Sequence, residues 1–187
     1  ELMYNEYVPI HSQYANSVYE NPNNEKFNYD PQKALELLRD AGYTKRNSDG
    51  WLVQEGSGKV LRFEINIYKS IEDRVTTLQQ MLKEYGIDMQ IKFMDFNSII
   101  KNVNERNFKI TSFKYTGLAF PNPETSMQSS LADKNNNNNI WGFKSERVDA
   151  LLKEYDIAFD MQERIKIIQE IDGIWAEVHP TAYGLGE

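Results

Sequence analysis

Residues 61–93 switch between two kinds of hydrophobic repeat, and this pattern constrains the fold more than any other feature of the sequence. Apolar and polar residues alternate over residues 61–68 and again over 87–93, which predicts two half-buried strands. Between them, apolar residues recur at helical spacing from Ile71 to Tyr85, and Gly86 provides a helix stop. A strand, a helix and a strand with tight links predict parallel strands joined by a right-handed crossover.

The same unit repeats once further along the chain. A short helix is expected from Asp95 or Asn97 to Arg106, and a strand over residues 108–115. The chain is therefore predicted to be an α/β domain with a mainly parallel sheet and flanking helices.

Capping residues mark three further helices. Asp30 precedes Pro31 and an apolar stripe, Ser145 precedes a second stripe, and Asp160 with Glu163 resembles a capping box. The apolar stripe of the first helix is Ala34, Leu35, Leu37, Leu38 and Ala41. The residues expected on the buried sides are Val148, Leu151, Leu152, Tyr155 and Phe159 in the second helix, and Ile165, Ile168, Ile171, Trp175 and Val178 in the third.

Charge and composition exclude several functions. The net charge of −7 argues against a nucleic-acid partner, because phosphate binding needs clustered Lys and Arg. The sequence has no cysteine, and its two histidines, His11 and His179, stand in no metal-binding or triad pattern. Neither a metal, a cofactor nor an enzyme active site is predicted. No apolar run approaches the roughly 18 residues that a membrane-spanning helix needs.

The long connection over about residues 116–143 has the candidate ligand surface, residues 115–124, at its start. It is long and is broken by Pro121 and Pro123, and connections of this length are usually functional or disordered. It follows the carboxyl end of a predicted parallel strand, which is where open α/β sheets generally bind ligands. Residues 135–139 within it are all asparagine, and this run is expected to form a mobile loop tip.

Several short segments occur in the order found in a known family. They are residues 29–34 (YDPQKA), 37–43 (LLRDAGY) and 49–50 (DG), the strand through Phe63, residues 82–88 (LKEYGID), 107–110 (NFKI), 148–152 (VDALL) and the helix from Gln162 to Trp175. Over residues 28–180 the chain resembles the extracellular solute-binding proteins of family 5, which serve ABC importers of oligopeptides, dipeptides, nickel complexes and similar solutes. Residues 107–110 depart from the family's Asp-Phe-Asp segment, since both acids are replaced.

The resemblance implies the C-terminal lobe of a two-lobed, hinged protein with the type II fold of periplasmic binding proteins. Residues 1–28 would be a connecting segment, residues 29–180 the α/β lobe, and residues 181–187 the start of a return to the second lobe. A periplasmic or extracytoplasmic, membrane-associated location and ABC permease subunits as partners are also implied. Residues 113–117 (FKYTG) resemble the subgroup that handles longer peptides or microcin-type, peptide-like antibiotics.

The ligand-binding residues are expected on the long connection and just before the penultimate helix. They are Tyr115, Thr116, Gly117, Leu118, Ala119, Phe120, Asn122 and Trp141. The aromatic residues offer flat apolar faces, and Thr116 and Asn122 offer hydrogen bonds. Structural packing is the alternative role for Phe120 and Trp141.

One position departs from the family pattern. Members that grip a peptide amino terminus often carry an Asp four residues before the proline that matches Pro123. Ala119 or Leu118 stands there in this chain, and neither can pair with an ammonium group. Recognition of the amino terminus would then need Glu124 or a residue of the second lobe.

The sequence favours a binding module over an enzyme. It would capture oligopeptides or peptide-like solutes in a cleft between this lobe and a second lobe, and deliver them to a permease. Two alternatives stay open: a receptor or adaptor that uses the same fold for protein–protein signalling, and an enzyme whose catalytic residues lie outside this sequence.

Overall fold

The computed structural model describes residues 8–112, 120–183 and 185–186. The chain divides into two compact units, one from Tyr29 to Tyr115 and the other from residues 1–28 together with 116–187. The fold is α/β, as predicted. Among the helices of the described residues, none has the length and apolar character required to cross a membrane.

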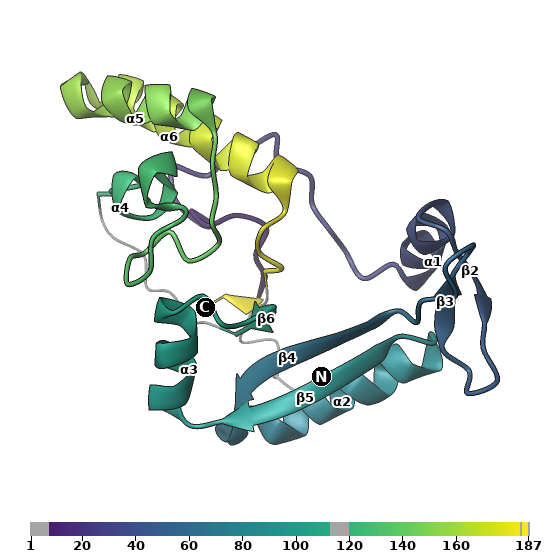
Figure 1. Ribbon diagram of the computed structural model, residues 1–187. Coiled ribbons are helices and arrows are strands. Elements are labelled where there is room, and N and C mark those ends of the chain that lie inside the picture. The colour runs from purple at the N-terminus through teal and green to yellow at the C-terminus, as the bar shows by residue number, and fades with distance from the viewer. Residues whose placement is uncertain (1–7, 113–119, 184, 187) are drawn as a thin grey trace. The chain divides into compact units, whose positions relative to one another are not determined.

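A parallel sheet with the strand order β5-β4-β6 forms the centre of the Tyr29–Tyr115 unit (Figure 1). β4 (Arg62–Tyr68) pairs in parallel with β5 (Asp88–Met94) along its whole length. β6 (Ile110–Thr111) pairs in parallel with the other edge of β4. The two strands predicted from alternation are confirmed. The strand predicted over residues 108–115 is represented by β6, and its residues from 113 onward lie outside the described residues.

Two helices supply the crossovers between these strands. α2 (Glu72–Glu84) follows a short 3-10 turn, η1 (Lys69–Ile71), and α3 (Phe96–Asn104) begins after Asp95, whose carboxylate accepts a hydrogen bond from the Ser98 backbone N–H. Both helices confirm the sequence prediction. Ile67 of β4, Val75 of α2 and Met89 of β5 form a buried apolar cluster, so α2 covers the face of the sheet to which the odd-numbered residues point.

A helix and a hairpin precede the sheet. α1 (Pro31–Asp40) begins as predicted, with the Asp30 carboxylate accepting from the Lys33 backbone N–H. Its apolar stripe is not covered in the described structure: no residue of α1 is buried, and Leu37 is exposed. Periodicity predicts which face is apolar, but not that another element covers it. β2 (Tyr43–Arg46) and β3 (Leu52–Gln54) then form an antiparallel hairpin.

The second unit is built on two long helices, α5 (Glu146–Ile157) and α6 (Met161–Val178), which pack side by side (Figure 1). Ser145 and Asp160 cap them as predicted. The same unit contains α4 (Glu124–Met127), the 3-10 turn η2 (Ser129–Leu131), and β1 (Val8–Pro9) paired antiparallel with β7 (Leu185–Gly186). Its buried core comprises Tyr19, Met127, Phe143, Val148, Leu151, Leu152, Tyr155, Ala158, Ile167, Ile168, Ile171 and Trp175.

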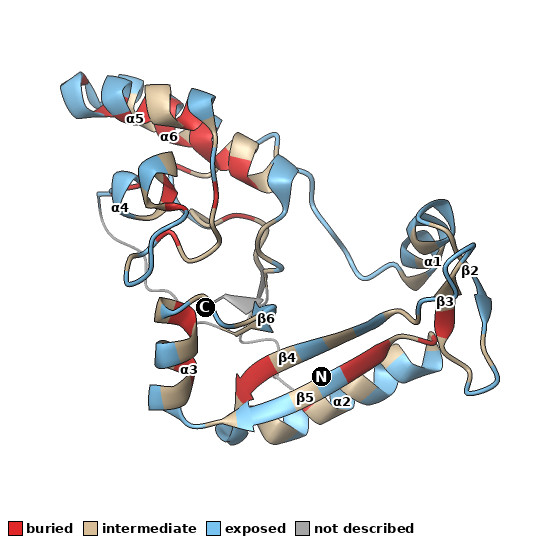
Figure 2. Ribbon diagram, viewed as in Figure 1, coloured by how far each residue is buried: buried red, intermediate tan, exposed pale blue. Residues whose placement is uncertain are grey.

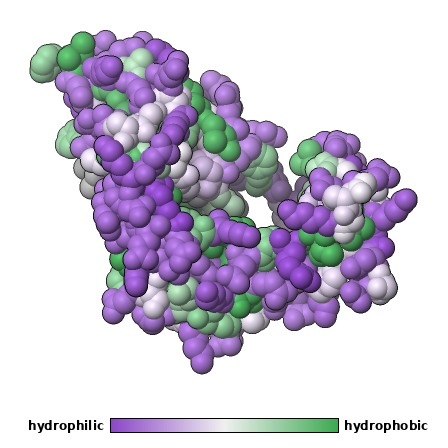
Figure 3. Space-filling view, viewed as in Figure 1, coloured by the Kyte–Doolittle hydropathy of each residue, from purple (hydrophilic) through white to green (hydrophobic). Residues whose placement is uncertain are grey.

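Two residues predicted to be buried on these helices are exposed. Phe159 has 95% of its surface exposed and Val178 has 58%. α5 ends at Ile157, and Ala158 adopts an extended conformation and is buried, so the helical period no longer applies at Phe159. Figure 2 shows buried residues along the inner sides of α5 and α6, and Figure 3 shows apolar surface at the free end of this helical pair.

The asparagine run does not end in a loop tip. The side chain of Asn139 is fully buried, donates hydrogen bonds to the backbone carbonyls of Gln128 and Phe143, and accepts one from the Phe143 backbone N–H. Asn137 accepts a hydrogen bond from the Asn139 backbone N–H. The loop-tip prediction is therefore wrong for these two residues, because a buried amide satisfies backbone groups that the turns leave without partners.

Candidate functional site

The strand order places a topological switch point between β4 and β6. The chain leaves β4 toward β5 through α2, and returns past β4 to β6 through α3. In open α/β sheets the crevice outside the carboxyl ends of such strands is the usual ligand site. β4 ends there at Tyr68 and β6 at Thr111, so residues 113–119 follow in sequence directly from the switch point.

Three polar or aromatic residues, Asn66, Tyr68 and Thr111, lie at this edge of the sheet. Asn66 is buried on β4, and its side-chain oxygen has no hydrogen-bond partner in the described structure. Its backbone carbonyl accepts a 3.1 Å hydrogen bond from the Thr111 hydroxyl across the switch point. Tyr68 stacks on Phe96 with a centroid distance of 6.0 Å and an interplanar angle of 18°, and Phe96 is exposed. Asn66 therefore offers a hydrogen-bond acceptor on the same strand as Tyr68, which stacks on the exposed ring of Phe96.

The proline segment of the other unit is held in place while its polar and aromatic residues project outward. Pro121 and Pro123 are buried, whereas Phe120 is 64% exposed and Asn122 is exposed. The Tyr155 hydroxyl of α5 donates a 2.8 Å hydrogen bond to the Pro121 backbone carbonyl. Since both prolines are packed inward, Phe120 and Asn122 are presented on an ordered backbone. Their role as ligand contacts stays a prediction.

Trp141 lies in a different environment. It is half-buried and contacts Trp175 edge-on, with ring centroids 4.9 Å apart. Phe143 packs on the same Trp175 ring at 5.1 Å. The structure thus joins Trp141 to the hydrophobic core of its unit, which favours the packing role that the sequence left as an alternative.

The remaining predicted ligand residues are Tyr115, Thr116, Gly117, Leu118 and Ala119, and all five lie outside the described residues. The structure places Phe120 and Asn122 on one short segment and Trp141 on another. The sequence reasoning passed over Asn66, Tyr68 and Phe96. Asn66 draws attention only once β4 is known to pair with β6. Alternation within one strand does not reveal this pairing.

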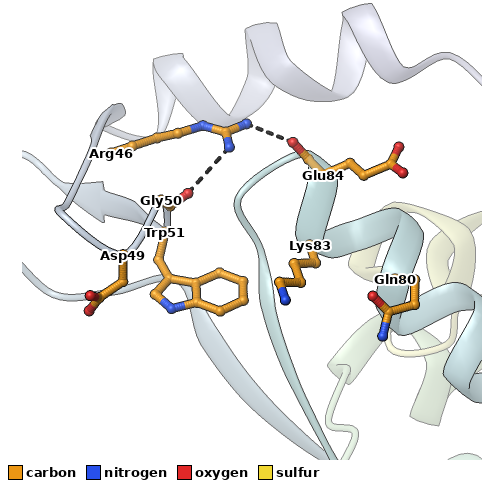
Figure 4. Close-up of a pocket in the computed structure, with 7 residues that line it drawn as sticks. All are labelled: Arg46, Asp49, Gly50, Trp51, Gln80, Lys83 and Glu84. Atoms are coloured by element: carbon orange, nitrogen blue, oxygen red, sulfur yellow. Dashed lines mark hydrogen bonds between the residues drawn. The ribbon is translucent and has the colours of Figure 1, made fainter.

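Two pockets occur in the Tyr29–Tyr115 unit. The first has a volume of about 430 Å³ and is lined by Arg46, Asp49, Gly50, Trp51, Gln80, Lys83 and Glu84 (Figure 4). The Arg46 guanidinium donates hydrogen bonds to the Gly50 and Glu84 backbone carbonyls, so it ties the hairpin to the end of α2. We interpret this pocket as a structural junction. The second, of about 480 Å³, is lined by residues on the amino-terminal side of the sheet, among them Arg62, Gln90 and Lys109.

The family model for bacterial extracellular solute-binding proteins, family 5 Middle, matches residues 1–138. The chain therefore belongs to this family, and its fold and segment order agree with the resemblance found in the sequence.

Individual relatives are proteins of much greater length. The chain is 26% identical over 161 residues to the oligopeptide-binding protein AppA of Bacillus subtilis, covering 84% of this chain and 29% of AppA. It is 26% identical over 166 residues to the probable peptide-binding protein YejA of Agrobacterium fabrum, covering 87% of this chain and 26% of YejA. The chain thus spans less than a third of either relative.

A solved structure supports the fold. The structure of AppA in complex with a nonapeptide matches with a TM-score of 0.81 and 22% sequence identity, over 96% of this chain and 36% of AppA. At this level of identity the match establishes the architecture.

Proposed function

We propose that this chain is part of the substrate-binding component of an ABC importer for oligopeptides or peptide-like solutes. The observation that carries the proposal is the strand order β5-β4-β6, because open α/β sheets with such an order usually bind ligands at the carboxyl ends of the strands on either side of the switch point, here β4 and β6. Membership of the family and the peptide-binding names of AppA and YejA support peptides as the solute.

The mechanism requires binding and closure, with no covalent step. The solute is held between this chain and a second lobe, and closure of the two lobes creates the state that the membrane permease recognises. Family membership supports an extracytoplasmic location, since the family consists of extracellular solute-binding proteins.

The ligand contacts proposed here are aromatic faces and amide hydrogen bonds. Phe120 can pack on an apolar side chain, and Asn122 can donate to or accept from a peptide backbone. Ala119 and Leu118 carry no charge, so a carboxylate that pairs with a peptide ammonium group is missing from both positions. We therefore expect affinity to depend weakly on whether the peptide amino terminus is free or acetylated.

The proposal is tested by titrating the full-length protein that contains this chain with a mixed peptide library, with calorimetry and tryptophan fluorescence as readouts. Saturable binding is expected. Phe120→Ala should weaken binding about tenfold, the usual effect of truncating an aromatic anchor. Phe159→Ala is the matched control, because Phe159 is equally aromatic and more exposed but lies at the end of α5.

Two results would contradict the proposal. A well-folded protein that binds none of the peptides would exclude peptides as its solutes and favour an adaptor role. Equal losses for Phe120→Ala and Phe159→Ala would show that the proline segment does not contact the ligand.

A further inference from the structure

A buried carboxylate holds the N-terminal segment against α6. Asp172 has 0% of its surface exposed, and both of its oxygens accept from the Ser12 hydroxyl, at 2.9 and 2.8 Å. Its Oδ2 also accepts from the Asn21 backbone N–H at 2.9 Å and from the Asn24 side-chain amide at 2.7 Å. All the donors belong to residues 12–24, so a single side chain of α6 organises that segment.

Further contacts bring the segment close to the helix. The Asn21 side-chain amide donates to the Gln169 backbone carbonyl at 2.9 Å, and the Gln169 side chain donates to the Val18 carbonyl at 3.0 Å. A Cβ atom at Gly173 would lie 2.6 Å from the Asn21 side-chain nitrogen, so only glycine leaves room for this approach. Residues 12–24 therefore pack closely against the turn of α6 that contains Gln169, Asp172 and Gly173.

The same carboxylate lies at the base of the two-stranded ribbon formed by β1 and β7. Ser12 follows β1 by three residues, and Tyr183 precedes β7 by two. Val8 pairs with Gly186 and Pro9 with Leu185. Tyr14 and Tyr183 pack against the core cluster that contains Ile171, next to Asp172 on α6. Burial raises the pKa of each phenol, and the charge of Asp172 raises it further. The approaches to both strands thus meet at Asp172.

An apolar residue at this place would cost less desolvation energy than a carboxylate. It would not orient the chain, however, because only a hydrogen-bond acceptor fixes the direction of three separate donors. The salt bridges of the described residues do not include Asp172, so directed hydrogen bonds are the contacts that offset its burial.

We propose that Asp172 is a positioning residue that fixes the β1–β7 ribbon on α6 and thereby sets the ligand affinity of the binding protein. The inference rests on the proposed function, in which a ribbon of this kind would link the lobe to its partner lobe. A loosened ribbon would make the closed, ligand-bound arrangement less well defined, and binding would weaken.

The test compares Asp172→Leu with Asp172→Asn. Leu accepts no hydrogen bond. Asn keeps one carbonyl oxygen for the Asn21 and Asn24 donors, and its NH₂ group can donate to the Ser12 hydroxyl. Asp149→Leu is the control, because Asp149 lies in the same unit and accepts from the Ser129 backbone N–H at 2.9 Å, away from the ribbon.

The first readout is amide hydrogen exchange of the chain. Asp172→Leu should speed exchange over residues 10–24 and 181–186 by about tenfold or more relative to α5. Asp172→Asn should stay near the wild-type rate, and Asp149→Leu should leave both segments unchanged. If Asp172→Leu does not fold, the double variant Ser12→Ala, Asn24→Ala removes two donors and should give the same local pattern.

The second readout is peptide affinity of the full-length protein, expected to fall about tenfold in Asp172→Leu and to be restored in Asp172→Asn. Unchanged exchange at the ribbon in Asp172→Leu would overturn the inference, and so would an equal effect of Asp149→Leu. A wild-type protein that binds no peptide would overturn the proposed function and the link to affinity, while exchange would still decide the anchoring role.

Discussion

The Tyr155 hydroxyl donates a 2.8 Å hydrogen bond to the Pro121 backbone carbonyl, and both residues are buried. Residues 120–123 belong to no helix or strand, and α4 begins only at Glu124. The tyrosine therefore connects α5 to the proline segment that presents Phe120 and Asn122. This contact spans 34 residues and couples the helical pair to the candidate ligand surface.

Tyr155→Phe isolates that hydrogen bond. The aromatic ring and the Arg164 guanidinium above it, 3.9 Å from the ring centroid, are kept. Loss of a partner for the buried carbonyl should lower the free energy of unfolding by about 1–2 kcal/mol, measured by urea denaturation. Tyr19→Phe is the control, because among the described residues the Tyr19 hydroxyl has one hydrogen-bond partner, the Met161 sulfur at 3.8 Å, which is a weak acceptor. A larger loss in Tyr19→Phe would contradict this assignment.

Asn139→Ala removes a fully buried amide that serves three backbone groups. We expect a loss of about 3 kcal/mol in the free energy of unfolding, since each unsatisfied buried group costs roughly 1 kcal/mol or more. Asn138→Ala, one residue earlier and exposed, should stay within about 0.5 kcal/mol of wild type. Thermal and urea unfolding of the two variants measure the difference. Equal losses of stability would contradict a structural role specific to Asn139.

Whether Gly173→Ala raises or lowers the free energy of unfolding should depend on the residue at position 21. In the wild-type background the new methyl group meets the Asn21 side chain and should destabilise the protein by about 1 kcal/mol, despite the better helix propensity of Ala. In an Asn21→Ala background the obstruction is gone, and the same change should stabilise by about 1 kcal/mol. A double-mutant cycle measures this, and additivity would refute close contact.

Burial raises the pKa of Asp172 above its ordinary value of 3.8, and the charge of Glu20 acts in the same direction, while hydrogen bonds from Asn21, Ser12 and Asn24 oppose it. A raised folded-state pKa means that the stability contributed by this group is present below pH 3.8 and is lost as the pH rises through the folded-state value. Tyr14 and Tyr183 also face the carboxylate, and their raised pKa values keep them neutral in this range.

Asp172→Asn should therefore be more stable than wild type at pH 7, and this advantage should shrink as the pH falls toward 4. Urea unfolding of the two proteins between pH 4 and 7 gives the difference directly, because the other titrating groups are shared. An advantage that grows on acidification would show that the carboxylate is stabilised by its donors more than it is destabilised by burial.

The sequence predicted the parallel sheet and its crossovers well, because alternation and helical spacing report burial within one element. It failed where burial depends on another element. Leu37 lies on an apolar stripe that no described element covers, and Phe159 stands just past the end of its helix. The role of Asp172 was not predictable from local patterns, because its donors lie 148 to 160 residues away.

The ligand-contact role of the candidate residues stays a prediction, and the structure adds only the exposure of two of them. The segment after the third strand was chosen for its place in the fold, and Phe120 and Asn122 do project from it. Trp141 was grouped with them because an aromatic residue near a predicted cleft suits both stacking and packing. Its contact with Trp175 comes from a helix more than 30 residues later, which no short-range pattern encodes.

The position of Asn139 at the end of its run has a consequence for how the gene can vary. In a tract of identical residues, replication slippage adds or removes copies without choosing which one. Because the buried amide is the last asparagine and Asn137 is the third from last, any such change leaves asparagine at both distances from Ile140. The upstream loop changes length, and so does the spacing of Asn137 from Leu131 and Lys134, whose carbonyls accept from its side chain. Closing a slightly longer loop costs little. The number of asparagines can therefore vary while a buried asparagine stays directly before Ile140.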